Sequence, residues 1–382
     1  MTRPTGGPRA ASTTTAAPRL LYLDNLRILL TVLVVVHHAA LTYGNLPLWY
    51  YHEPAQDPSG IVLDVLVAIN QTFFMGFFFL ISGFFTPGSY DRRGGRGFVR
   101  GRLVRLGIPL LAFMLVLRPL LNFGGLAPLR EAFAQDGAAL PYWRYYLLSW
   151  DPGPMWFVEV LLVFTLVYAL LRTIRGQAAP VAQPARAPAP LAIAGFVAVL
   201  GLVTFAWRFA VPVGTYWAVV GLPSPSHLPQ YVLLFVIGAL AYRRGWLTAL
   251  PARYGRVGFI AAGASLVAFA VASVALRQAG GAAQLLLAAV CEAAFATSLI
   301  IGLLVVYRER WNRQRAFGRC LSADAYAVYV VHPLVLVALG YALSWLHASA
   351  VVKFLVLAVL AVPQCWMLAH AVRSLPHVKR VL

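Results

Sequence analysis

Long apolar runs recur along almost the whole chain and constrain its fold more than any other feature. About 20 mostly apolar residues are needed to cross the hydrocarbon core of a bilayer as a helix. Runs of this kind lie at 20–43, 61–85, 103–123, 155–172, 191–210, 229–244, 257–276, 284–306, 325–345 and 352–372. Because lipid offers no water to pair with backbone groups, these runs predict an all-α, polytopic membrane helical bundle with about ten transmembrane helices.

The composition favours a lipid bilayer as partner and argues against nucleic acid. The chain is 60% hydrophobic and 11% charged, whereas soluble domains carry about 25% charged residues. Its net charge of +19 comes mainly from short segments between apolar runs, so no soluble element offers the continuous basic face that nucleic acid requires. The cysteines lack metal-like spacing, so we expect neither a metal site nor a disulfide framework; they are Cys291, Cys320 and Cys365.

The distribution of Lys and Arg predicts the orientation of the chain. If the N-terminus is cytoplasmic, most of these residues fall in cytoplasmic segments. The opposite loops then hold only Arg130, Arg144, Arg208 and Arg277. By the positive-inside rule, this asymmetry predicts an even number of spans with both termini in the cytoplasm.

Outside the apolar runs, the sequence predicts two terminal tails and one linker. Residues 1–19 are small, polar and proline-containing, which predicts a disordered cytoplasmic tail. Residues 176–190 form a Pro/Ala-rich cytoplasmic linker within a single membrane domain over 20–372. Residues 373–382 are expected to be a cytoplasmic C-terminal tail.

The first apolar run carries an unusual set of ionisable residues. At about 100° per residue, Arg27 and His38 lie within roughly 20° of each other on one helical face, about 16 Å apart along the axis. Asp24 lies within about 60° of Arg27, whereas His37 is turned about 80° away. The alternative is an Asp–Arg pair at the helix entrance with a structural histidine, but the shared face favours a functional site, since ionisable groups are costly in hydrocarbon.

Two arginines lead into the third run. Arg102 and Arg105 are three residues apart and therefore neighbours on a helix, where two guanidinium groups suit a polyphosphate. Ordinary positive-inside charge is an equally good explanation, because Arg92, Arg93, Arg96 and Arg100 precede them.

Three further segments carry polar groups within apolar runs. Ser82 and Gly83 favour close helix packing rather than a catalytic serine. Glu159 begins the fourth run and is open to three roles: a second general base, a charge partner for a histidine, or an interfacial residue. Tyr326, Tyr329 and His332 form a polar stripe on the ninth run, read either as interhelical hydrogen bonding or as a wall of a donor site.

Together these segments resemble the acyltransferase 3 family of polytopic bacterial membrane acyltransferases. The pattern "LDNLR", ten residues and His38 is similar to that family's Arg-x10-His motif, and Arg102 with Arg105 matches its Arg-x-x-Arg motif. "FFLISGF", "MWFVEVLL" and "YAVYVVHP" follow in the family's usual order. The start of the chain looks most like the glucan biosynthesis protein C-like branch.

The resemblance implies an enzyme of the bacterial plasma (inner) membrane. It would transfer an acyl group, often acetyl or succinyl, from cytoplasmic acyl-CoA to a hydroxyl of a carbohydrate or other acceptor. His38 would be the catalytic residue, with Arg27, Arg102 and Arg105 as donor-site or structural partners. The doubled histidine leaves His37 as the alternative, although the shared helical face favours His38.

We expect His38 to act as a general base, with an acyl-histidine intermediate as the covalent variant. Asp24 would orient Arg27, and no metal is expected. The competing interpretation is a transporter or flippase of a glycosidic or acidic substrate, although no inverted repeat is visible in the sequence. An inactive scaffold is a third, and the sequence leaves a homo-oligomer open.

Overall fold

The computed structural model describes residues 20–123, 126–135, 139–148, 150–176, 185–218, 220–275 and 281–382. The predicted tail over 1–19 and most of the predicted linker over 176–190 lie outside these residues. Within them the secondary structure is helical apart from one bridge between Trp217 and Leu222. The prediction of an all-α membrane bundle is therefore confirmed.

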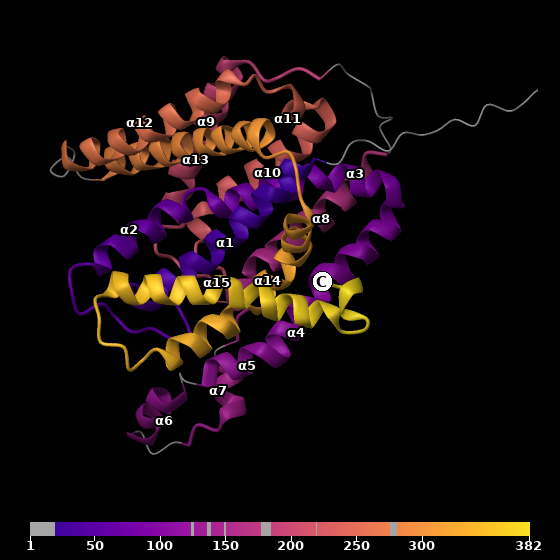
Figure 1. The fold of residues 1–382 in the computed structure, drawn as a ribbon. Coiled ribbons are helices and arrows are strands. Elements are labelled where there is room, and N and C mark those ends of the chain that lie inside the picture. Colours follow the sequence, from indigo (N-terminus) through magenta and orange to yellow (C-terminus); the bar gives the residue numbers. More distant parts are fainter. Residues whose placement is uncertain are drawn as a thin grey trace, which may run out of the picture.

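The described elements follow one another as helices joined mostly by short connections (Figure 1). They are α1 (Leu21–Tyr43), α2 (Gly60–Gln71), α3 (Phe74–Arg102), η1 (Leu103–Gly107), α4 (Ile108–Ala112), η2 (Phe113–Leu117), α5 (Arg118–Asn122), α6 (Leu126–Gln135), α7 (Tyr142–Leu148), η4 (Gly153–Met155), α8 (Trp156–Ile174), α9 (Pro190–Ala210), η5 (Pro225–His227), α10 (Leu228–Arg244), α11 (Trp246–Ala249), α12 (Arg253–Ala275), α13 (Ala282–Arg310), α14 (Ala316–Ala342), α15 (Ala350–Ser374) and η6 (Val378–Arg380).

Among the described residues, 8 helical stretches are long and apolar enough to cross a membrane. Ten runs were expected, and the difference has a structural origin. The stretch Gly60–Asn122 is 63 residues long and holds two of the expected spans, which are separated where Gly94 adopts a φ of 68° that glycine tolerates. α10 covers the sixth expected span with 17 residues, slightly fewer than a typical span.

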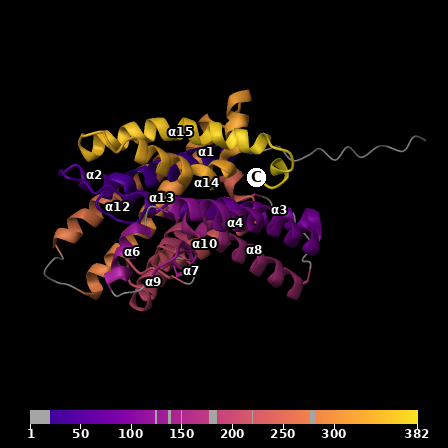
Figure 2. The same ribbon diagram turned by 90° about the horizontal axis from the view of Figure 1, so that it is seen from below.

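α1 lies in the interior of the bundle, against α14 and α15 (Figure 2). Leu26 and Leu30 join the larger hydrophobic cluster, whereas Val35 and Ala39 join a second cluster with α14 and α15. All four side chains are fully buried. The ionisable residues of α1 are therefore held by a helix that is covered on more than one side.

α3 and α10 approach each other closely at two glycines. A Cβ on Gly83 would lie 2.1 Å from the carbonyl oxygen of Phe235, and a Cβ on Gly238 would lie 2.1 Å from that of Leu80. Only glycine permits this backbone separation. The predicted packing role of the Ser82–Gly83 segment is confirmed.

Buried cations in the described residues are paired with carboxylates. Arg118 contacts Asp151 at 2.5 Å, and Arg208 holds both oxygens of Glu292 at 3.2 and 2.5 Å. Lys353 pairs with Glu53. Because an unpaired buried charge is costly, these pairs explain how the helices that carry these cations tolerate them in a membrane domain.

Candidate active site

One hydrogen bond of His38 determines which tautomer its neutral imidazole ring adopts. Its Nδ1 lies 2.8 Å from the carbonyl oxygen of Val34, one turn earlier on α1. A carbonyl oxygen only accepts, so Nδ1 carries the proton and donates it. In the neutral ring Nε2 then keeps its lone pair, and this is the form of imidazole that removes a proton from a substrate.

Two further aromatic side chains lie against His38. Its ring centroid is 4.2 Å from that of Trp49, in the loop after α1, and 5.0 Å from that of His332 on α14. His332 is fully buried, whereas His38 keeps part of its surface open. His37 is buried and stacks on Phe74 with a centroid separation of 5.0 Å. Of these three histidines, His38 is the most accessible.

His332 owes its orientation to the proline that follows it. Pro333 has no N–H, so it cannot bond the carbonyl of Tyr329 one turn earlier. His332 Nδ1 donates to that oxygen instead, at 2.7 Å. Its Nε2 is buried without a hydrogen-bond partner in the described chain. The His-Pro pair therefore leaves a second imidazole lone pair beside His38.

The same device appears at the other end of the polar stripe. Pro109 cannot donate to the carbonyl of Arg105, and the hydroxyl of Tyr326 donates to that oxygen at 2.9 Å. Between these ends, the hydroxyl of Tyr329 donates to the carbonyl of Pro154. The hydroxyls of Tyr326 and Tyr329 thus fit the first interpretation of the stripe, interhelical hydrogen bonding. Tyr326 lies beside the paired arginines and His332 lies beside His38, and the donor wall stays a prediction.

The depth at which the two histidines meet follows from how α1 and α14 start. The side chain of Asn25 donates to the carbonyls of Trp311 and Arg313 at 2.6 and 3.1 Å, so the two helices begin side by side. His38 and His332 each lie about 25 Å along their helices from these starts. Two helices that start together thus bring their histidines to one level.

Asp24 and Arg27 form the predicted pair near the start of α1. Arg27 Nη1 lies 3.6 Å from Asp24 Oδ1, and the Arg27 side chain is 38% exposed while that of Asp24 is 11% exposed. Thr31 donates to the Arg27 carbonyl at 2.8 Å. Arg27 is therefore the more exposed member of the pair, and its carboxylate partner is largely buried.

The paired arginines occupy the junction between α3 and η1. Arg102 lies over the ring of Phe98 at 5.0 Å, and Arg105 is more exposed than Arg102. Tyr326 connects the Arg105 backbone to α14. These arginines are therefore linked to the helix that carries His332.

Glu159 is not joined to the histidines. It lies in the first turn of α8 and is half-buried. Among the described residues it makes no hydrogen bond or ion pair. Its neighbour Trp156 packs on Tyr231 at 5.4 Å between ring centroids.

Trp49 is the contact that sequence reasoning missed. It lies in the loop between α1 and α2, where no helical period assigns a direction to a side chain. The only available signal was the aromatic sequence "LWYYH" close after the doubled histidine.

The chain resembles known proteins along most of its length. A family model described as an acyltransferase domain matches residues 20–370. Glucans biosynthesis protein C of Salmonella heidelberg (strain SL476) is 27% identical over 231 residues, which cover 59% of this chain and 59% of that protein. The protein of that name from Salmonella paratyphi B (strain ATCC BAA-1250 / SPB7) is 30% identical over 152 residues, which cover 40% of this chain and 38% of that protein.

The alignment with the first of these relatives thus spans 59% of its length. No solved structure matches the chain. The family model, however, covers the helices that carry the imidazoles, the stripe and the paired arginines. This chain therefore belongs to the acyltransferase 3 family of membrane acyltransferases.

Proposed function

We propose that this protein is an integral-membrane O-acyltransferase that uses acyl-CoA as donor, with acetyl or succinyl as the acyl group. The acceptor is a hydroxyl of a carbohydrate or a similar molecule. The observation that carries the proposal is the oriented imidazole of His38, whose Nδ1–H is bound to Val34 and whose Nε2 is free to act as a base.

The reaction begins with the acceptor hydroxyl beside His38 Nε2. The imidazole removes the hydroxyl proton as the oxygen attacks the thioester carbon. The C–S bond then breaks, a C–O ester bond remains, and the imidazolium returns its proton to the leaving thiolate. An acyl-histidine intermediate is the covalent alternative, in which Nε2 itself attacks the thioester.

The donor is held from the end of the bundle where α1 begins. Arg27, Arg102 and Arg105 bind the phosphates of CoA, since guanidinium groups recognise phosphate bidentately. Asp24 keeps Arg27 in place. The pantetheine arm then runs past Tyr326 and Tyr329 toward His332 and His38, over about 16 Å along the axis.

The acceptor reaches His38 from the side of Trp49. An indole ring offers the flat apolar surface on which a sugar ring stacks, and Trp49 lies directly on the His38 imidazole. The name of the curated relatives, Glucans biosynthesis protein C, supports a carbohydrate acceptor. Glu159, which has no partner among the described residues, remains a candidate for a second acid or base.

The setting of this reaction is the bacterial plasma (inner) membrane. We propose that both termini are cytoplasmic and that residues 20–372 form one membrane domain. This orientation follows from the distribution of Lys and Arg. It gives the arginine end access to cytoplasmic acyl-CoA and turns the His38 end toward the far side.

The test is thiol release by the purified protein with acetyl-CoA or succinyl-CoA and a panel of sugar and glycan acceptors. The proposal predicts release that depends on acceptor and equals the acylated product formed. Reconstituted vesicles that move a labelled glycan unchanged, without thiol release, would instead identify a transporter.

A further inference from the structure

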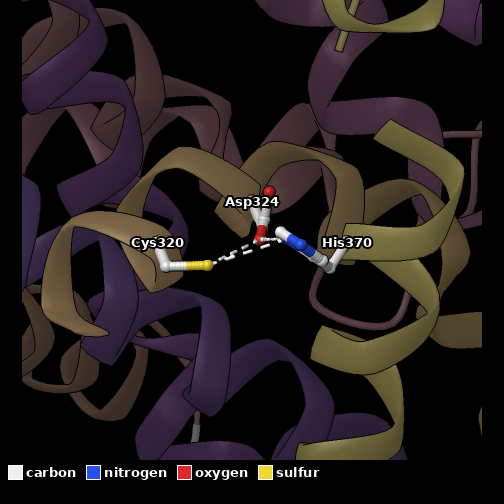
Figure 3. A group of neighbouring side chains, drawn as sticks. All are labelled: Cys320, Asp324 and His370. Carbon is white, nitrogen blue, oxygen red and sulfur yellow. Dashed lines mark hydrogen bonds and ion pairs between the residues drawn. The ribbon is translucent and has the colours of Figure 1, made fainter. Parts of the chain in front are cut away.

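A second cluster of chemically active side chains lies outside the active site, where the start of α14 meets the end of α15. Figure 3 shows Cys320 and Asp324 of α14 turned toward His370 of α15. Cys320 and Asp324 are four residues apart, so they share a helical face. Local spacing did not predict this group, because His370 lies 50 residues after Cys320 along the chain.

The distances between the donor atoms are close to those of a metal site. Cys320 Sγ lies 3.5 Å from Asp324 Oδ2 and 3.7 Å from His370 Nδ1, and His370 Nδ1 lies 2.9 Å from that oxygen. A tetrahedral zinc ion with bonds of about 2.0–2.3 Å separates its ligands by about 3.3–3.7 Å. The two distances from Cys320 Sγ therefore fit a zinc site. The distance between His370 Nδ1 and Asp324 Oδ2 would have to lengthen by about 0.4 Å on binding.

The surroundings supply the support that a metal ligand needs. Arg373 donates to the other carboxylate oxygen of Asp324, and the Asp324 side chain is only 2% exposed. Partners of this kind fix a ligating carboxylate in its orientation. Cys320 is exposed and the His370 side chain is 66% exposed, so an ion has access from solvent.

The alternative is a hydrogen-bonded cluster without metal, in which the Cys320 thiol donates to Asp324 Oδ2 at 3.5 Å. That contact is weak, because a thiol is a weak donor. A thiolate, an imidazole and a carboxylate that converge from two helices are the ligand types that zinc takes in proteins.

We propose that Cys320, Asp324 and His370 bind one divalent ion of the zinc class, with water as fourth ligand. Binding releases the thiol proton, and the proton of a neutral imidazole moves from Nδ1 to Nε2. Asp324 is eight residues before His332, about 12 Å along α14. The ion would therefore link α14 to α15 at a distance from the candidate active site. This proposal does not depend on the proposed acyltransferase chemistry.

The test uses Co²⁺ as a spectroscopic probe for Zn²⁺ on the full-length protein in detergent, after removal of bound metal with a chelator. We expect one Co²⁺ per chain with a thiolate-to-cobalt charge-transfer band, and we expect Zn²⁺ to displace it. Cys320→Ser removes the band and His370→Gln weakens binding at least tenfold. Cys365→Ser, which changes a buried cysteine elsewhere on α15, leaves both unchanged.

Size-exclusion chromatography establishes that each variant is folded before its spectrum is compared. A second readout is labelling of Cys320 by a maleimide, which Zn²⁺ slows at least tenfold if the thiolate is a ligand. Absence of the charge-transfer band in the wild-type protein, or its persistence in Cys320→Ser, overturns the proposal.

Discussion

At the scale of single residues, the site depends on backbone carbonyls that orient imidazole rings. The carbonyl oxygen of Val34 accepts a hydrogen bond from His38 Nδ1, and that of Tyr329 accepts one from His332 Nδ1. In the second case the carbonyl is available because Pro333 lacks an N–H. A proline that reads in the sequence as a helix breaker is thus part of the site.

Replacing Pro333 with Ala tests that role. The new N–H competes for the Tyr329 carbonyl, and His332 loses its fixed orientation. We expect kcat to fall about tenfold, which is the effect of losing about 1.4 kcal/mol of orientation, while the KM for acyl-CoA changes little. Pro363→Ala in α15 is the matched control, and an equal loss in both variants would assign the effect to general helix damage.

The pH dependence tests the protonation state of His38. Its Nε2 must be unprotonated to accept the acceptor's proton, and the ordinary imidazole pKa is about 6.5. We expect kcat/KM to rise about tenfold per pH unit on the acidic limb and then level off. The acidic limb should survive in His37→Ala; a profile that is flat over the whole range would contradict a titrating base.

At the scale of helices and loops, the sequence predicted which residues share a face of one helix, but it predicted few of the contacts between helices. Arg27 and His38 share a face because α1 is regular, so spacing alone relates them. Trp49 lies in a loop without a period, and His332 meets His38 because α1 and α14 begin side by side. Neither relation is encoded in local spacing, so neither could be predicted from the sequence.

The paired arginines give a prediction for the segment that joins α3 to η1. A lost hydrogen bond to a phosphate costs about 1.5–3 kcal/mol, so Arg102→Ala and Arg105→Ala should each raise the KM for acetyl-CoA about tenfold to hundredfold. With S-acetylpantetheine, which lacks the nucleotide, variants and wild type should behave alike. Arg96→Ala serves as control, and an equal defect with both donors would rule out phosphate binding by these arginines.

The close contact of α3 with α10 predicts the effect of a single methyl group. Gly83→Ala places a Cβ against the Phe235 carbonyl, and overpacking of this kind costs about 1–3 kcal/mol. We expect a lower thermal midpoint in detergent. Gly263→Ala on α12, where a Cβ has open space, should not lower it; equal midpoints for the two variants would contradict the close packing.

At the scale of the whole molecule, the candidate site joins arginines and histidines at different depths of one bundle. The arginines lie nearer the starts of α1 and α14 than the histidines do. Arg27 precedes His38 by about 16 Å along α1, and Tyr326, which bonds the Arg105 carbonyl, precedes His332 by about 9 Å along α14. In the orientation proposed above, the arginine end is cytoplasmic, and we expect the donor to enter from that side and the acceptor from the other.

Cys320 offers a test of this orientation, since it is exposed near the start of α14 while Cys291 and Cys365 are buried. A membrane-impermeant maleimide should label it in inside-out vesicles and spare it in right-side-out vesicles. Zinc must be chelated first. Labelling only in right-side-out vesicles would invert the proposed topology.

The most direct test of the central claim compares His38→Ala with His37→Ala in acceptor-dependent thiol release from acyl-CoA. We expect His38→Ala to lose at least a hundredfold in kcat, because a general base contributes about 10²–10⁴-fold, and His37→Ala to keep most of the activity. Full activity of His38→Ala, or loss only in His37→Ala, would contradict the assignment of His38 as the base.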